Sequence, residues 1–520
     1  MITRPLLIIF FVCSCLFFYN LSARDFWAPD EGDFAEIVRE LDNNYIVPHL
    51  NGKPYGEKPP LFYYIVYASK KALHWTKDET SMRIPSSLFA LIGGIFFFLT
   101  IRKFFNRKKA ILSTCILISA PLFYWQARYL QVDMVFAVFI ALSLLFFFWF
   151  YHGGKKAFLY LFFICSSLAF MTKGPLSIIL VFPVVLIHLS LEKDFRVLKM
   201  KETYIGILIF MAIILPWYLA IYFKEGMPYL YENIVRQNLT RFFDAWSHKR
   251  PIYYYLTTLP LDFFPWSLFL PMGIYLAATQ FRHDPKIRFF LIWFFWMFVF
   301  LSISSGKISK YMLPVLPSIA LITGFTITEE ESKYNLFMFM LLSILFFIMG
   351  IFLFLYKTSI YPEFYCERIL YGSLSIALSI IIYLLLRTKN LTNVFIALFS
   401  FMAVLYMIAN ISVYEKWNQY KSPKPMCDRI KPFVRDGTPW VYYGSMRGIY
   451  IYYIGTFAIP VDEHKTEELK KLKGELREFF ILTRKRDIKE VSGTLIDVNQ
   501  LFEEKIGDTV MVFAHYKDKM

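Results

Sequence analysis

Acidic and basic side chains gather just after the first apolar segment of the sequence. Asp30 and Glu31 come first, and Lys58 follows, directly before Pro59 and Pro60. Acidic residues beside a membrane are costly unless they are paired or functional, and a carboxylate can accept or position the proton of a hydroxyl group. A proline restricts the residue before it to extended backbone, which holds Lys58 in a stiff turn. A lysine held at the height of the headgroups suits a lipid phosphate.

The same residues also allow a purely structural interpretation. Asp30 and Glu31 follow Pro29, which is typical of a helix start with Asp30 as its N-cap. Lys58 would then be a lysine that snorkels, with its stem in apolar surroundings and its charge in water. A helix start accounts for the acidic pair but leaves the lysine–proline segment unexplained.

The composition is that of a chain that spends most of its length in a membrane. Of its 520 residues, 57% are hydrophobic and 20% are aromatic, but only 18% are charged, whereas soluble domains carry about 25% charged residues. Lipid-facing helices and aromatic belts at the membrane interface account for such values. The formal net charge is +16, which we assign to cytoplasmic loops rather than to a nucleic-acid partner.

Long apolar stretches recur from the N-terminus to residue 413. A spanning helix needs about 20 mostly apolar residues, which predicts a mainly α, polytopic membrane protein with about 13 transmembrane helices. The predicted spans are 5–22, 83–101, 110–126, 133–151, 157–172, 174–191, 203–223, 254–279, 287–304, 310–327, 335–356, 367–386 and 392–413. The apolar stretch 60–75 is short, so we expect an interfacial helix there. No cleavage site follows the first span, which favours a retained anchor over a signal peptide.

Basic residues are distributed unevenly between alternate loops. Cytoplasmic loops of membrane proteins carry an excess of lysine and arginine. With the N-terminus in the cytoplasm, the basic loops fall inside, at 102–109, 155–156, 193–201, 282–288 and 387–389. The same orientation places the long loops 23–82 and 224–253 and the tail on the outer side of the membrane.

The tail differs in character from the rest of the chain. We expect a transmembrane domain over 1–413 and a small α/β extramembrane domain over 414–520, because charged stretches there alternate with short strand-like segments. These segments are Trp440–Tyr443, Phe479–Thr483 and Thr509–Ala514. Cys366 and Cys427 lie outside the predicted spans, and a disulfide between them is one possibility. No cysteine and histidine spacing suggests structural zinc.

Several short motifs occur in order on the predicted outer side. In the first loop they are Asp30-Glu31, Ala35-Glu36-Ile37, 47–52, 57–61 and Met82-Arg83-Ile84-Pro85; further on they are 128–134, 171–175, 238–242 and 307–314. Their content and spacing resemble the bacterial aminoarabinose transferases (ArnT-like) and the related protein O-mannosyltransferases. Those enzymes have the GT-C fold and use polyprenyl-phosphate sugars. Gly32-Asp33-Phe34 departs from the Thr-Arg-Tyr that often follows Asp-Glu in the family, which leaves sugar and acceptor open.

The resemblance implies an inverting glycosyltransferase without a required cofactor. It implies roles for three acidic residues at the reacting groups, Asp30, Glu31 and Asp133, and for three residues at the donor lipid phosphate, Lys58, Arg241 and Tyr311. Preplaced cations stabilise the leaving phosphate, and an arginine can hold it through two donors; Arg236 competes with Arg241 for this role. Further candidates for substrate binding are Arg83, Arg128, Lys173, Lys307 and Lys310. Each of three candidates also has a structural interpretation. Asp133 would be a carboxylate at a helix end, and Lys173 and Lys307 would be anchors at the membrane interface.

Several functions remain open on these residues. Lipid A of the lipopolysaccharide is the first acceptor that we consider, and proteins or another cell-envelope glycan are the alternatives. A phosphate acceptor needs no base, and Asp30 would then orient it. A reaction that uses a divalent metal stays open, with His248 as the candidate ligand. A lipid or solute transporter would show ionisable groups at mid-bilayer and repeated halves, neither of which the sequence contains.

Overall fold

The computed structural model describes residues 4–280, 282–328, 333–356, 361–388, 390–495 and 497–518. The chain divides into two compact units. The helical unit contains Met1–Leu21, Gly56–Ile65 and Arg83–Val413, and the sheet unit contains Ser22–Tyr55, Val66–Met82 and Tyr414–Met520. Most of the first predicted outer loop, 23–82, therefore packs with the tail rather than with the spanning helices.

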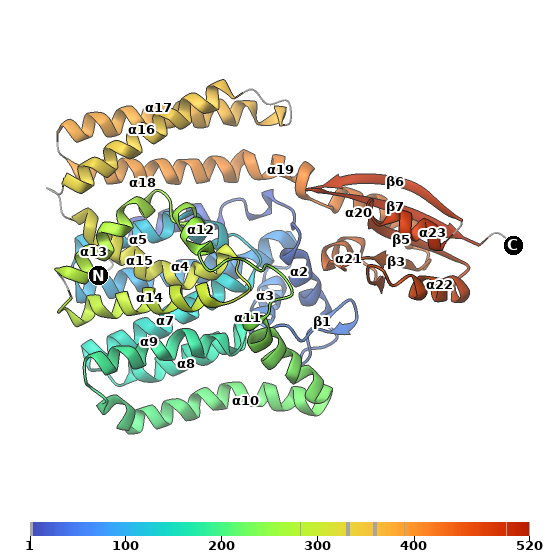
Figure 1. The fold of residues 1–520 in the computed structure, drawn as a ribbon, viewed down its shortest axis with the longest axis horizontal. Coiled ribbons are helices and arrows are strands. Elements are labelled where there is room, and N and C mark those ends of the chain that lie inside the picture. The colour runs from blue at the N-terminus through green and yellow to red at the C-terminus, as the bar shows by residue number, and fades with distance from the viewer. Residues whose placement is uncertain are drawn as a thin grey trace. The chain divides into compact units, whose positions relative to one another are not determined.

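The helical unit consists of long apolar helices that lie side by side (Figure 1). Its helices are α1 (Arg4–Phe18), α4 (Asp78–Phe104), α5 (Arg107–Ser119), α6 (Pro121–Ala127), α7 (Val132–Gly153), α8 (Ala157–Lys173), α9 (Leu176–Leu191), α10 (Lys201–Leu230), α11 (Arg241–Phe243), α12 (Tyr254–Asp262), α13 (Leu270–Thr279), α14 (Pro285–Ile303), α15 (Leu316–Thr328), α16 (Lys333–Leu355), α17 (Tyr365–Arg387) and α18 (Leu391–Ile408). Short 3₁₀ turns connect several of them, among them η5 (Ser309–Val315).

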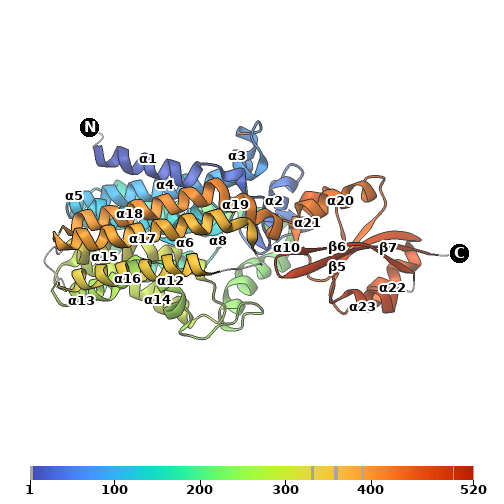
Figure 2. The ribbon, with the colours of Figure 1, turned by 90° about the horizontal axis from the view of Figure 1, so that it is seen from above.

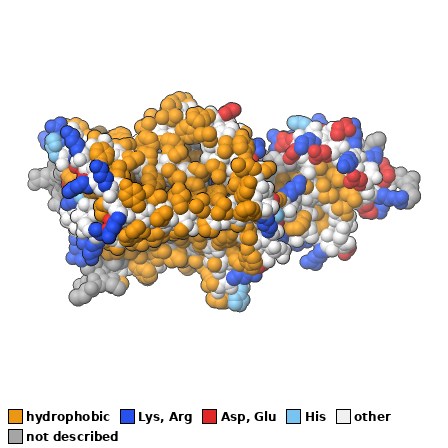
Figure 3. All heavy atoms as spheres, turned by 90° about the horizontal axis from the view of Figure 1, so that it is seen from below, with side chains coloured by type: hydrophobic (Ala, Val, Ile, Leu, Met, Phe, Trp, Pro, Cys, Tyr) orange, Lys and Arg blue, Asp and Glu red, His pale blue; other side chains and the backbone are white. Residues whose placement is uncertain are grey.

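The surface of these helices suits a lipid environment. Large apolar side chains are exposed on α10, α16 and α17, among them Leu208, Phe352 and Leu384. Figure 3 shows such side chains covering a broad area of one face. A soluble protein rarely exposes so large an apolar area, and lipid tails solvate it.

The candidate membrane spans lie where the sequence predicts them. Within the described residues, eight helices are long and apolar enough to cross a membrane, and two bent helix pairs, α5 with α6 and α12 with α13, could add one span each. Three of the predicted spans, 5–22, 157–172 and 174–191, contain shorter apolar helices. The polytopic helical class is confirmed, and the number 13 stays a prediction. Lys389, which we assigned to an inner loop, lies outside the described residues.

The segment predicted as the outer loop 224–253 is helical as far as Phe243, and its place on the outer side stays a prediction. Helix α10 continues through a π-helical segment, η3 (Tyr231–Thr240), into α11. Gly226 interrupts α10 with a φ of 73°, a backbone conformation that glycine adopts without steric cost. Sequence periodicity missed this helix because the kink and the π-helical turns change which residues share a face.

The sheet unit contains a five-stranded mixed sheet (Figure 2). Its strand order is β4-β3-β5-β7-β6, with β3 (Trp440–Tyr443), β4 (Ile459–Val461) and β5 (Glu478–Arg484) parallel, and β6 (Val498–Ile506) and β7 (Thr509–Lys517) antiparallel. Its helices are α19 (Tyr414–Lys421), α20 (Lys424–Val434), α21 (Gly448–Ile454), α22 (Thr466–Glu475) and α23 (Ile488–Thr494). The small α/β fold and all three predicted strands are confirmed, whereas β4 and β6 were not predicted.

One face of this sheet packs into an apolar core. Val441, Phe479 and Val512 lie in it with residues of α22 and α23, Leu469 and Val491. Cys366 and Cys427 are both free thiols, so the disulfide that the sequence left open is not formed between them.

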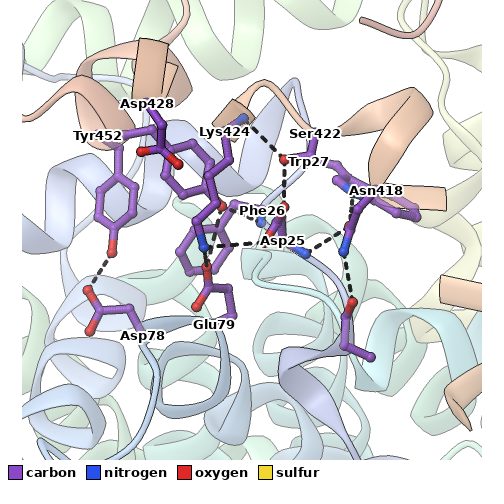
Figure 4. Close-up of polar contacts among 12 residues, drawn as sticks. Asp25, Phe26, Trp27, Asp78, Glu79, Asn418, Ser422, Lys424, Asp428 and Tyr452 are labelled. Carbon is purple, nitrogen blue, oxygen red and sulfur yellow. Dashed lines mark hydrogen bonds and ion pairs between the residues drawn. The ribbon is translucent and has the colours of Figure 1, made fainter. Parts of the chain in front are cut away.

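The first-loop segments of the sheet unit contribute α2 (Asp30–Glu40), the hairpin β1–β2 (His49–Leu50 and Lys53–Pro54) and part of α3 (Leu61–Ala72). Asn418 of α19 accepts hydrogen bonds from the backbone N–H of Asp25 at 3.0 Å and from the indole of Trp27 at 3.1 Å (Figure 4). Lys424 of α20 pairs with Asp25 at 3.6 Å and with Glu79 at 3.7 Å. These polar contacts join segments that lie almost 400 residues apart in sequence.

Candidate functional site

The helical unit encloses a cavity of about 470 Å³ that combines an apolar wall with positive charge. Three cations line it, Lys58, Lys173 and Arg241, together with Tyr311. The apolar wall is formed by Pro175, Leu176, Ile179, Ile234, Val235, Leu239, Phe242, Phe243, Phe300 and Leu301, and the remaining lining residues are Gln237, Asn238, Ser304 and Gly306. Four residues that the sequence singled out far apart in the chain therefore meet at one cavity.

Lys58 is held by the loop that precedes α3. Asn233 of the π-helical segment donates a hydrogen bond to the carbonyl oxygen of Gly56 at 2.9 Å, and Pro59 and Pro60 behind the lysine are buried. The Lys58 ammonium donates to the carbonyl oxygen of Glu57 at 3.2 Å. Removal from water lowers the pKa of Lys58 to about 8, and the positive charges of Arg241 and Lys173 act in the same direction. The site therefore favours an anion that would restore the full charge of this lysine.

Arg241 opens α11 at the end of the π-helical segment. Its Nη1 donates to Gln237 Oε1 at 3.2 Å, and its guanidinium lies 5.5 Å from the centroid of the Trp246 ring. The competing candidate Arg236 instead pairs with Glu232 at 2.9 Å on the exposed side of the helix and does not line the cavity. The position of Arg241 leaves its other guanidinium nitrogens available for an oxyanion in the cavity.

Lys173 connects the cavity to a buried carboxylate. Its ammonium lies 2.5 Å from Asp133 Oδ1 and 4.5 Å from the centroid of the Tyr311 ring. Lys310 approaches the other oxygen of Asp133 at 3.7 Å. Asp133 itself is buried at the start of α7. The carboxylate thus pairs with two lysines and does not line the cavity, and its role at the reacting groups stays a prediction.

Three basic residues predicted to bind substrate donate hydrogen bonds to backbone carbonyl groups. Arg83 is fully buried in α4 and donates to the carbonyl oxygen of Leu21 at 2.7 Å. Arg128 donates to the carbonyl oxygens of Leu16 and Phe17 near the end of α1, at 2.9 and 3.0 Å.

Lys307 is also buried, and it also donates hydrogen bonds to backbone carbonyl groups. Its ammonium donates to the carbonyl oxygen of Arg250 at 2.9 Å and to that of Ser304. Like Arg83 and Arg128, it satisfies backbone carbonyl groups, a role that loop motifs do not distinguish from ligand binding.

The acidic pair of the first loop belongs to the sheet unit. Glu31 is fully buried, where it accepts hydrogen bonds from Arg24 Nη2 at 3.0 Å and from the Trp27 N–H at 3.1 Å. Asp30 is half-buried and begins α2. The predicted helix start is confirmed, but its N-cap is Pro29 rather than Asp30, and it has no side-chain capping bond. Neither acidic residue lines the cavity in the described part of the chain.

No metal-binding cluster accompanies the cavity among the residues that the structure describes. They contain no group of three or more histidine, cysteine, aspartate or glutamate side chains arranged to hold an ion. His248 takes a left-handed backbone conformation with a φ of 59°, and its carbonyl oxygen accepts a hydrogen bond from the Lys307 N–H at 3.0 Å. Its position suits a turn, and no metal role is assigned to it.

Two polar lining residues were not predicted. Gln237 lies four residues before Arg241, and Ser304 follows the end of α14. Helical spacing places residues i and i+4 side by side, so the pairing of Gln237 with Arg241 could have been found once the segment was recognised as helical. Ser304 carried no signal, because it depends on where α14 ends.

Comparison with known proteins supports this description. Residues 1–226 match the family model for dolichyl-phosphate-mannose-protein mannosyltransferases. An uncharacterized protein of Aquifex aeolicus is 30% identical over 64% of this chain and 65% of its own length. The undecaprenyl phosphate-α-4-amino-4-deoxy-L-arabinose arabinosyl transferase 2 of Proteus mirabilis is 32% identical over 61% of this chain and 58% of its own. The alignments thus cover less than two thirds of these relatives.

The structure of the whole chain also has a solved counterpart. The crystal structure of ArnT from Cupriavidus metallidurans bound to undecaprenyl phosphate superimposes with a TM-score of 0.83, over 98% of this chain and 97% of that one, at 17% sequence identity. A likeness at this identity establishes the fold, and the GT-C architecture implied by the loop motifs is confirmed. The chain therefore shares its fold with this ArnT, and about three fifths of it is similar in sequence to an aminoarabinose transferase.

Proposed function

We propose that this chain is a membrane glycosyltransferase that transfers a sugar from a polyprenyl-phosphate donor to an acceptor in the cell envelope. The observation that carries the proposal is that three cations, Lys58, Lys173 and Arg241, line the same cavity as a mostly apolar wall. A lipid phosphate has this dual character, with an apolar tail and a compact negative charge.

The cations act on the leaving group. When the bond between the anomeric carbon and the phosphate oxygen breaks, the electron pair remains on that oxygen, and the lipid phosphate departs with additional negative charge. Donors fixed before the reaction stabilise such a charge most effectively in a site of low polarity. Arg241 supplies a guanidinium suited to two phosphate oxygens, Lys58 supplies a point charge, and Tyr311 supplies a hydroxyl donor.

The acceptor oxygen forms the new bond on the opposite side of the anomeric carbon, which inverts its configuration. An acceptor phosphate is already ionised and needs no base, whereas a hydroxyl acceptor must lose a proton. We keep Asp30 as the candidate for that base or for acceptor positioning. We propose that Glu31 stabilises the loop through Arg24 rather than contacting substrate, and that the reaction requires no metal.

Lipid A is the acceptor that we favour, because the named relatives are aminoarabinose transferases. The family model that matches residues 1–226 describes protein mannosyltransferases instead, so a protein acceptor is the second candidate. In either case we place the reaction on the periplasmic side of the inner membrane, with the N-terminus in the cytoplasm, on the grounds of loop charge.

The test is expression of the chain in a Gram-negative host that makes the aminoarabinose donor but lacks its own transferase. Mass spectrometry of lipid A should show a mass increment of one sugar with the wild-type chain and no increment with Arg241→Ala. Arg236→Ala is the matched control and should retain the increment. Unmodified lipid A together with newly glycosylated envelope proteins would transfer the assignment to the protein acceptor. The absence of both, with the protein present in the membrane, would refute transfer.

A further inference from the structure

A second cavity lies within the sheet unit and differs from the first in being mostly polar. It has a volume of about 220 Å³. Three cationic side chains line it, Lys421, Arg447 and Arg484, with the phenol rings of Tyr442 and Tyr450. A water molecule occupies about 30 Å³ in the liquid, so the cavity has room for a group of several heavy atoms.

The strand order explains why these residues meet. β3 and β5 are parallel neighbours, with Tyr442 opposite Leu482. Arg484 lies two residues beyond Leu482 and therefore on the same face of the sheet as Tyr442, since side chains alternate along a strand. The two residues sit at the carboxyl ends of adjacent parallel strands, where open α/β sheets place their ligands.

Arg447 provides a cation without an internal partner. It directly precedes α21, and among the described residues none forms an ion pair or hydrogen bond with its guanidinium. The N–H of Gly448 beside it already donates to Asp33 Oδ1 at 2.6 Å. The free donors at this point of the cavity therefore belong to the arginine side chain and not to the end of the short helix.

Two buried phenols add neutral donors. Tyr442 is 2% exposed and Tyr450 is 4% exposed, yet within the described chain neither hydroxyl has a hydrogen-bond partner. Buried hydroxyl groups are normally satisfied. Burial raises the pKa of Tyr442 to about 12 and that of Tyr450 well above its ordinary value, although Arg447 and Arg484 oppose both shifts. Both phenols therefore remain protonated and can donate.

The charge balance of the lining favours an anion. Arg484 is partly neutralised by Glu463 at 2.8 Å, and Asp508 is the acidic residue on the lining itself. Asp508 is exposed at the turn between β6 and β7. Lys421 and Arg447 remain uncompensated by any partner within the described residues. A carboxylate has two acceptor oxygens, whereas a phosphate group has at least three and could engage two arginines, a lysine and the phenols together.

We propose that this cavity of the sheet unit is a phosphate-binding site, separate from the cavity at Lys58, that takes a phosphate monoester or inorganic phosphate. Arg447 and Arg484 hold the oxygens, Lys421 supplies further charge at the entrance, and Tyr442 and Tyr450 donate from the buried side. The phosphate has two possible sources, a soluble phosphate compound or the headgroup of a phospholipid.

The test is hydrogen–deuterium exchange of the full-length protein in detergent, read by mass spectrometry. Inorganic phosphate, added at constant ionic strength against chloride, should slow exchange of residues 443–450 and 506–511 in a saturable manner. Because the readout is local, phosphate bound at the Lys58 cavity does not contribute to it. Phosphatidic acid in the micelles, compared with diacylglycerol, tests the headgroup source. Protection by phosphatidic acid alone assigns the site to a headgroup.

Arg447→Gln should raise the half-saturating phosphate concentration by about tenfold or more, because one charge-assisted hydrogen bond is lost. Lys421→Gln changes an exposed side chain, so the sheet unit should fold as in the wild type, and binding should weaken as well. Arg435→Gln, an exposed arginine at the end of α20, is the matched control and should bind as the wild type does. Absence of protection by both phosphate sources, or equal protection in Arg447→Gln and wild type, would overturn the proposal.

Discussion

Lys173 at the end of α8 lies 2.5 Å from Asp133 at the start of α7. The arrangement complements both helix dipoles, since a carboxylate is favourable at a helix N-terminus and a cation at a C-terminus. Both side chains are largely withdrawn from solvent, at 9% and 4% exposure. A charge-assisted bond in such surroundings holds the lysine in one orientation. The cavity therefore receives a cation whose position is set by a residue that does not line it.

Asp133→Asn should reduce transfer by about tenfold or more, because Lys173 and Lys310 lose the charge that orients them. The donor KM should rise, since the cations that receive the phosphate are no longer fixed. Asp194→Asn, which removes the partner of exposed Arg196, is the control and should behave as the wild type. Unchanged donor kinetics in folded Asp133→Asn would contradict the positioning role.

Arg241→Ala should lower kcat by about 10²-fold, as does the loss of a single donor from an oxyanion site. Arg241→Lys keeps the charge but not the planar pair of donors, and should fall between the alanine variant and the wild type. Arg236→Ala should lose little, because an exposed ion pair contributes about 0–1 kcal/mol. The measurement is steady-state transfer with purified protein. Equal losses in Arg241→Ala and Arg236→Ala would deny Arg241 its special role.

The pH profile should report Lys58. Its pKa is lowered to about 8 by burial, so the ammonium is charged below that pH and becomes neutral above it. An anionic donor is attracted to the charged form, and kcat/KM, which reports the free enzyme, should fall as pH rises through about 8. Lys58→Arg stays charged over this range and should shift the decline upward. A decline at the same pH in both proteins would assign it to another group.

Glu31→Ala should destabilise the sheet unit by about 3–5 kcal/mol, because it removes the carboxylate that pairs with the buried charge of Arg24. The loss should appear as a lower unfolding midpoint and faster proteolysis. The double variant Arg24→Met with Glu31→Leu removes both charges and should recover much of the stability. Full recovery of transfer in that double variant would confirm that Glu31 acts through the fold, and loss of transfer without loss of stability would restore it as a substrate contact.

The parts of the fold that depend on local composition could be predicted from the sequence. Apolar length predicted the spanning helices, and alternation predicted three strands of the sheet. The motifs predicted that Lys58, Arg241 and Tyr311 act together at the donor phosphate, and all three line one cavity. The polar contacts of Arg83 and Arg128 could not be predicted, because their partners are backbone carbonyls at distant helix ends. Residues that pair although they are distant in sequence, such as Asn418 with Asp25, leave no local pattern in the sequence.

The departure at Gly32-Asp33 illustrates the same limit. In the sequence it suggested a difference in acceptor or sugar. In the structure Asp33 accepts the N–H of Gly448, and Gly32 faces Ile449 of α21. Both residues serve the packing of α2 on the tail, so the departure reflects a helix contact that only the folded sheet unit reveals.

Gly32→Ala tests that contact. A Cβ at Gly32 would lie 2.1 Å from the Cβ of Ile449 and 2.4 Å from its Cα, so α2 and α21 would have to separate. We expect overpacking to cost about 1–3 kcal/mol or more, with faster hydrogen exchange in both helices. Gly474→Ala is the matched control, because a Cβ there meets no neighbouring atom, and its helix should gain about 0.5–1 kcal/mol. Ile449→Ala should not rescue Gly32→Ala, since the clash with the Ile449 Cα involves backbone that truncating the side chain leaves in place. Rescue by that second substitution would show that the side chain alone sets the spacing of the two helices.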